Sequence, residues 1–137
     1  MAGKTITLNP DGPHSAEYTR EVAHSMAEAV RVLNHATADP AGLDCPSDVA
    51  VVIESLGQAV RGLEQTCGQL SRWLGNEYQA DRLAESSAGR HGGNTAAAMT
   101  DALGALDHTV ATIRVLAAHL NQVHQITHAL EAKVTTT

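Results

Sequence analysis

One stretch of this sequence, from Asn94 to Val134, most restricts the fold that the chain can adopt. It opens with an asparagine suited to capping a helix, contains no proline, and has a single glycine, Gly104. A continuous helix of this length, at ~1.5 Å per residue, would be a rod on the order of 60 Å long. One small domain cannot cover such a rod on every side, so we expect it to organise both the fold and an interface.

Apolar side chains recur along this stretch at steps of three and four, which is the spacing of one helix face. The stripe continues through Ile113 to Leu130 and is close to a heptad seam. Val115 and Ile126 lie off the stripe, on a side with few charges. The sequence therefore predicts a helix over 95–133 with a second apolar face beside its main seam.

Two earlier stretches have the same spacing. The first, 15–37, starts at the potential cap Ser15 and ends before Pro40, which disfavours helical geometry in the residue before it. The second covers 47–75, and its pattern permits an extension to Leu83. These patterns predict an all-α fold of three helices. The second and third would form a long antiparallel hairpin, with the first packed on it.

Three glycines of the second helix, Gly57, Gly62 and Gly68, lie off its apolar stripe. Each costs roughly 1 kcal/mol relative to alanine inside a helix. We expect that another backbone approaches closely at these glycines, with a bend in the helix as the alternative.

The remaining segments are expected to be irregular. Residues 1–14 are predicted to be an extended arm that frays or lies against the body or a partner, and 135–137 a frayed tail. The single helical domain would then cover 15–134. The glycine-rich segment 85–94 could hold an anion on its backbone N–H groups, but it lacks P-loop spacing, so a plain mobile linker is predicted.

The charge balance argues against several classes of partner. The net charge is −6 and no run of basic residues occurs, which disfavours nucleic acid and anionic membranes. There is no signal-peptide core and no stretch of ~18 apolar residues, so we expect no membrane association. Cys45 and Cys67 form no disulfide framework. The sequence predicts a cytoplasmic protein, and its scarce lysine and abundant alanine, glycine and histidine indicate a high-GC bacterial source such as an actinomycete.

No pattern predicts catalysis or a cofactor. His124 and His128 stand at i and i+4 and share a helix surface, so they are candidate metal ligands. A catalytic zinc site needs three protein ligands and a structural site needs four, and no carboxylate or cysteine stands at matching spacing. Glu21 and His24 form one ExxH pattern where di-iron bundles need two. We therefore expect no metal, no cofactor and no enzymatic activity.

The tripeptide Trp73-Leu74-Gly75, between two long helices, resembles the WxG turn of the WXG100 helical-hairpin proteins, which are small secreted dimers. The resemblance would cover 47–134. This chain differs in its additional N-terminal helix, its long loop, and a Tyr78-Gln79-Ala80-Asp81 spacing that does not match the family's C-terminal signal. From the residues alone, Trp73 is an apolar anchor of the core or the hairpin end. The chain also resembles small Ala/Leu-rich helical proteins of unassigned function in actinomycetes, and from this resemblance no activity can be inferred.

Three wide apolar stripes exceed what one three-helix layer buries, so we expect a homodimer or higher oligomer. The leading functional prediction is a non-enzymatic interaction or scaffold protein whose long helices bind a second copy or another helical protein. The alternatives are a small regulator of another macromolecule, a WXG-like secreted hairpin, and a metal-binding bundle. The predicted interface residues are Leu63, Leu70, Leu106, Ile113, Val115, Leu120, Ile126 and Leu130.

Overall fold

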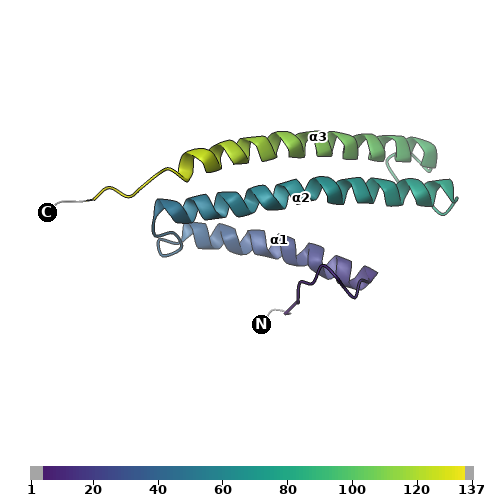
Figure 1. The fold of residues 1–137 in the computed structure, drawn as a ribbon. Helices are drawn as coiled ribbons and strands as arrows, with labels where there is room; N and C mark the ends of the chain where they lie inside the picture. Colours follow the sequence, from purple (N-terminus) through teal and green to yellow (C-terminus); the bar gives the residue numbers. More distant parts are fainter. Residues whose placement is uncertain (1–4, 135–137) are drawn as a thin grey trace. The chain divides into compact units, whose positions relative to one another are not determined.

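The computed structural model describes residues 5–134 and contains three helices, α1 (Ala16–Ala38), α2 (Pro46–Gln79) and α3 (Thr95–Thr127) (Figure 1). The described part of the chain contains no β-strand, so the predicted all-α class is confirmed. The predicted tail, 135–137, and the first four residues of the predicted arm lie outside the described residues.

Local capping chemistry sets where the helices begin. The Ser15 hydroxyl accepts a hydrogen bond from the Tyr18 N–H at 3.0 Å, and the Asn94 side chain accepts one from the Ala97 N–H at 3.1 Å. α2 begins at Pro46, where the missing N–H of proline leaves no intrahelical bond unmade. Each helix therefore begins within a residue or so of its predicted start.

The chain divides into two compact units, Met1–Asp44 and Cys45–Thr137. The first contains the arm and α1, which buries none of its residues. Met26 and Leu33, both from the predicted apolar stripe of α1, are exposed. The expected single domain over 15–134, with α1 packed across the hairpin, stays a prediction.

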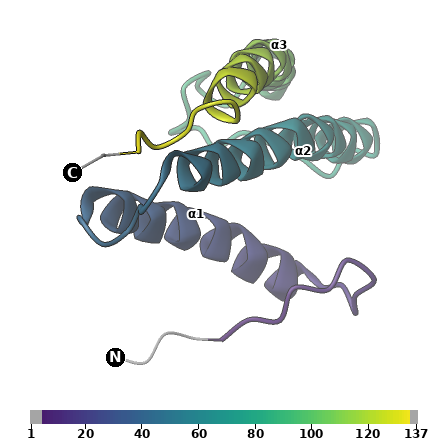
Figure 2. The ribbon, with the colours of Figure 1, turned by 60° about the vertical axis from the view of Figure 1, so that its left-hand side comes forward.

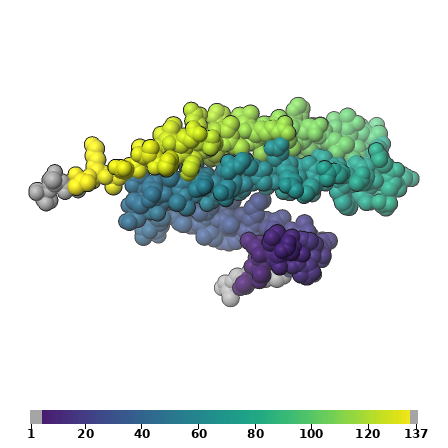
Figure 3. All heavy atoms as spheres, in the orientation of Figure 1, coloured from purple at the N-terminus to yellow at the C-terminus, as the bar shows by residue number. Residues whose placement is uncertain are grey.

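In the second unit, α2 and α3 lie side by side along their lengths, as two ribbon views and the space-filling view show (Figures 1, 2 and 3). Arg114 bonds to Glu64 at 2.8 Å, and His124 lies 3.9 Å from Glu54. The contact nearer the C-terminus of α3 is thus made with a residue nearer the N-terminus of α2. The predicted antiparallel hairpin is therefore confirmed.

The hairpin has a thin core. Among the described residues, the buried apolar side chains are Ala50, Met99 and Ile113. No side chain in this part of the chain is less than 2% exposed. Two paired helices cover only one side of each other, so the outer faces of α2 and α3 stay open within the hairpin itself.

The end of α3 differs from the prediction. The helix ends at Thr127, although the sequence pattern extends to residue 133. Leu130 and Val134 are 54% and 90% exposed, so burial does not stabilise further turns. The Thr127 hydroxyl also donates to the Val123 carbonyl at 2.9 Å, a local bond of the kind that weakens helix ends. α2, in contrast, continues past residue 75 to Gln79, as its pattern permitted.

Candidate functional site

Four of the predicted interface residues belong to the seam between α2 and α3. Ile113 is 8% exposed, and Leu63, Leu106 and Leu120 are half-buried. Leu120, two turns after Ile113, approaches Gly57 of α2. These side chains therefore contribute to packing inside the hairpin rather than to an open surface.

The other four predicted interface residues are exposed. Val115 and Ile126 of α3 are 57% and 60% exposed, and Leu70 of α2 and Leu130 beyond α3 also lie open. Their exposure leaves them available to contact another element or another molecule. Whether they form an interface stays a prediction.

The outer side of α3 from Val115 onwards forms an apolar face without charged side chains. At 3.6 residues per turn, Val115 lies nearly opposite Ile113 on the helix. Leu116 and Val123 are exposed beside Val115 and Ile126. From Val115 to residue 130 the sequence contains no aspartate, glutamate, lysine or arginine. We call the exposed side chains of Val115, Leu116, Val123 and Ile126, with the intervening small and neutral residues, the outer face of α3.

Trp73 does not have the anchoring role that the sequence predicted. It lies inside α2, before the helix ends at Gln79, and it is 58% exposed. Val51 and Leu70 of the same helix are also exposed. The apolar pattern of α2 is broader than the strip that α3 covers, which explains why the spacing from Leu70 suggested a buried tryptophan.

The glycines of α2 differ from one another. A Cβ atom on Gly57 would lie 3.9 Å from the Leu120 Cβ and 3.3 Å from an Arg61 guanidinium nitrogen. At this glycine α3 therefore approaches through a side chain at van der Waals distance, and the close approach of another backbone stays a prediction. Gly62 and Gly68 have no such neighbour within 4 Å, and for them the prediction is wrong within the hairpin. Beside Gly57 lies a hollow of about 220 Å³, lined by Ile53, Glu54, Gly57, Arg61, Leu120, Asn121 and His124.

The candidate metal ligands His124 and His128 have stacked rings, with centroids 5.9 Å apart and planes inclined by 13°. A carboxylate oxygen of Glu54, in α2, lies 3.9 Å from the His124 Nε2. Spacing within α3 could not reveal Glu54, because it comes from the other helix. Within residues 5–134 no three histidine, cysteine or carboxylate side chains are arranged to hold a metal ion.

The loop between α2 and α3 is folded around a carboxylate. Glu85 accepts hydrogen bonds from the backbone N–H groups of His91 at 3.1 Å and Gly93 at 2.8 Å. Its Oε2 also lies 3.0 Å from the His91 Nδ1, while the His91 Nε2 lies 2.5 Å from Asp101 of α3. The Glu85 N–H donates to the Thr95 hydroxyl at 3.0 Å. The predicted plain linker is therefore wrong, since this segment makes a specific bonded structure.

The electrostatics of this loop favour two ionised groups. Hydrogen bonds from Asp101 and then Glu85 raise the pKa of His91 above its ordinary value. Burial acts to raise the pKa of Glu85, but the bonds from Gly93 and His91 outweigh it and lower that pKa. When His91 is protonated, its imidazolium lies between two carboxylates and links the loop to α3.

The sequence offered a partial signal for this loop. The glycines near His91 indicated backbone N–H groups that could bind an anion, and they do bind one, the chain's own Glu85. Gly93 has φ +91°, a conformation that residues with a side chain rarely adopt, and this directs its N–H to the carboxylate. The contact between His91 and Asp101 could not be predicted from the sequence, because it depends on how the loop turns back onto α3.

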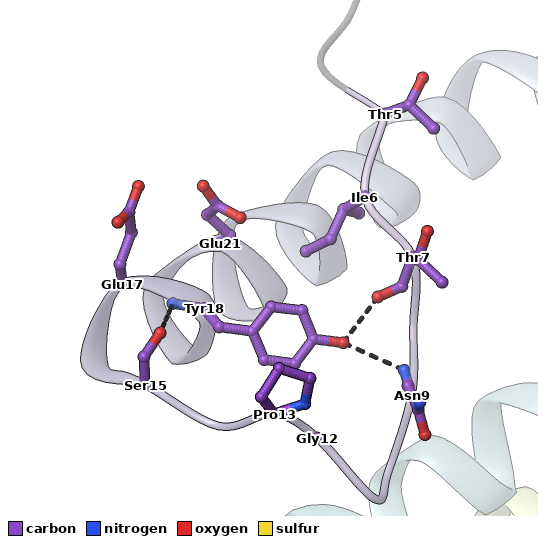
Figure 4. Close-up of a pocket in the computed structure, with 10 residues that line it drawn as sticks. All are labelled: Thr5, Ile6, Thr7, Asn9, Gly12, Pro13, Ser15, Glu17, Tyr18 and Glu21. Carbon is purple, nitrogen blue, oxygen red and sulfur yellow. Dashed lines mark hydrogen bonds between the residues drawn. The ribbon is translucent and has the colours of Figure 1, made fainter.

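In the first unit the arm folds back onto the start of α1. The Tyr18 hydroxyl donates to the Thr7 carbonyl at 2.6 Å and accepts from the Asn9 N–H at 3.0 Å (Figure 4). Around this ring lies a pocket of about 520 Å³, lined with Glu17 and Glu21 on the helix side (Figure 4). Of the predicted alternatives for the arm, residues 5–14 therefore lie against their own unit.

The two cysteines are free thiols in different surroundings. Cys45 is exposed at the N-terminus of α2, where its N–H donates to Asp48 at 3.1 Å. Cys67 is half-buried in the predicted stripe of α2.

Comparisons with known proteins add no functional assignment. No protein-family model, curated protein or solved structure matches the chain. Trp73-Leu74-Gly75 lies inside α2 rather than in the turn that follows it, and the WXG100 resemblance stays a prediction. Among the helices of the described residues, none has the combined length and apolarity needed to cross a membrane.

Proposed function

We propose that this protein is a non-enzymatic interaction protein that oligomerises or binds a helical partner through the outer surfaces of its long hairpin. The observation that carries the proposal is the outer face of α3, where Val115 and Ile126 are 57% and 60% exposed on a surface without charged residues. Solvated helix faces normally carry charged side chains. A continuous apolar face, with no such charged side chains, is typical of a surface that another helix covers.

The thin core supports the same proposal. The hairpin buries Ala50, Met99 and Ile113, and its remaining apolar side chains are at least partly open. Fully burying an exposed valine or isoleucine is worth about 1.5–3 kcal/mol, so covering the half-exposed Val115 and Ile126 would each contribute roughly half of that. A partner on this face would therefore stabilise the hairpin as well as bind it.

Light scattering over a range of protein concentrations tests self-association directly. Capture of partners from the native cell, with wild-type protein compared with Ile126→Asp, tests binding to another protein. The proposal predicts either a concentration-dependent oligomer or a captured protein that Ile126→Asp loses. A monomer at every concentration, with no capture that depends on Ile126, would contradict it.

The proposal includes a reducing cytoplasmic environment. Free Cys45 and Cys67 support it, because exposed thiols such as Cys45 persist best where disulfides do not form. Fractionation of the native cell checks the location. Recovery of the protein from the culture medium without lysis would instead favour the secreted, WXG-like alternative.

A further inference from the structure

We propose that a second copy of this chain covers the outer face of α3, docked antiparallel about a two-fold axis that passes between His119 and Gln122. This inference rests on the proposed function and names the partner. Its basis is the self-complementary order of side chains along the outer face.

A two-fold interface requires that each contact occur twice, with residue i against j and j against i. Along the outer face, Val115, His119, Gln122 and Ile126 follow one another at steps of four, three and four. This spacing is the same when it is followed in either direction. Two antiparallel copies centred between His119 and Gln122 therefore bring matching positions of the two helices opposite each other.

The chemistry of the opposed positions also matches. Val115 would meet Ile126 of the partner subunit, and both side chains are exposed in the single chain. Leu116 and Val123 lie on the same edge of the face and are both exposed, so Leu116 would lie near Val123 of the partner subunit. His119 would meet Gln122 of the partner subunit, and an imidazole and an amide can each donate and accept hydrogen bonds. The polar pair is central and the larger apolar pairs flank it.

The distribution of charge on the chain also favours a second copy as the partner. The chain has a net charge of −6, so two copies repel each other over most of their surface. The outer face of α3 has no charged residue to repel its own copy. The adjacent Arg114 bonds to Glu64 of α2 at 2.8 Å, so its charge is engaged within the hairpin. A neutral face on an acidic protein is the surface on which identical molecules meet most readily.

Opposite charges at the paired positions provide the test. Val115→Lys alone and Ile126→Asp alone should each weaken the dimer at least about tenfold in dissociation constant, because each buries an unpaired charge. An equimolar mixture should restore dimers containing one of each variant, because the antiparallel arrangement places the introduced ammonium group of one variant against the introduced carboxylate of the other. Thr100→Asp adds a negative charge to an exposed part of α3 away from the face and should leave the dimer unchanged. Light scattering reports mass, and circular dichroism reports helix content.

Each outcome decides the proposal. Dissociation by both single variants with helix content retained, followed by recovery in the mixture, supports it. A mixture that stays monomeric contradicts the antiparallel pairing, and unfolding by either variant shows that the chain itself covers the face. Oligomers that persist in both variants would overturn this interface and leave the proposed function standing. A monomeric wild-type protein that captures no partner would remove both.

Discussion

The inner and outer faces of α3 carry similar apolar side chains in different surroundings. On the inner face, Ile113 is buried against α2, and the contact of Arg114 with Glu64 lies at its margin. On the outer face, Val115 is more than half exposed, and the residues of this face include no charged side chain. The inner face is thus covered and held in register within the chain. The outer face has the apolar composition of a buried surface, but no other part of the hairpin covers it.

This difference shows why an apolar stripe does not identify its own partner. Burial of Ile113 depends on α2, which the connecting loop places along the same side of α3. Nothing within the hairpin plays that role for Val115. Substitutions on the two sides should therefore differ in their effect on stability, and the following experiments are ordered by the size of the expected effect.

The largest effect is expected from Ile113→Asp, which would bury an unpaired carboxylate in the seam. We expect a loss of about 3–5 kcal/mol in the free energy of unfolding, enough to unfold a marginal hairpin. Denaturation followed by circular dichroism measures it. The matched variant Val115→Asp should retain its helix content at low protein concentration. Equal damage from both variants would abolish the distinction between the two faces.

A smaller loss is expected from Gly57→Leu, which places a large side chain where α2 and α3 are close. A Cβ atom added at Gly57 would lie 3.9 Å from the Leu120 Cβ, so we expect the larger leucine side chain to crowd Leu120. Overpacking of this kind costs about 1–3 kcal/mol, which chemical denaturation would measure. Gly57→Ala is the control. The atom nearest to the alanine Cβ would be the end of the flexible Arg61 side chain, which can move away. An unchanged stability in Gly57→Leu would show that the close approach is not required.

Gly62→Ala should instead stabilise the protein. No side chain or other helix lies within 4 Å of the added Cβ, and alanine is favoured over glycine inside a helix by about 1 kcal/mol. A higher midpoint of thermal unfolding would confirm this. A lower midpoint would show that another element or another copy packs against Gly62, which would place a second covered face on α2.

The smallest effect is expected from the pH dependence of the loop. The pKa of His91 is raised in the folded chain, so the stability that its protonated ring contributes is complete below its ordinary pKa of about 6.5. This contribution disappears as the pH rises through the raised value. The pKa of Glu85 is lowered, so its contribution disappears only as the pH falls through that lowered value. Thermal unfolding at a series of pH values measures both.

His91→Gln provides the control for the pH series. It keeps a side chain that can form hydrogen bonds but has no charge to lose. Its thermal stability should therefore vary less than that of the wild type above neutral pH. A wild-type profile that matches the variant would show that the contacts with Glu85 and Asp101 do not contribute through the protonated ring.

The helices were predictable because their signals are local. Ser15 and Asn94 cap helices from their own sequence neighbourhood, and stripes of period three to four mark the helical segments. The folded loop was less predictable, because the bond from His91 to Asp101 joins two segments that the loop brings together. Trp73 was misassigned because its spacing from Leu70 describes one face of a helix but not which part of that face α3 covers.

The sequence by itself determined the all-α class, the places where the helices begin and the two apolar sides of α3. These follow from backbone propensity and side-chain periodicity, which act over a few residues. Only the tertiary structure decided that Gly57 meets Leu120 while Gly62 meets nothing, and that Ile113 is buried while Val115 is exposed. The physical reason is that burial depends on which surface arrives opposite a side chain, and that depends on the path of the whole chain.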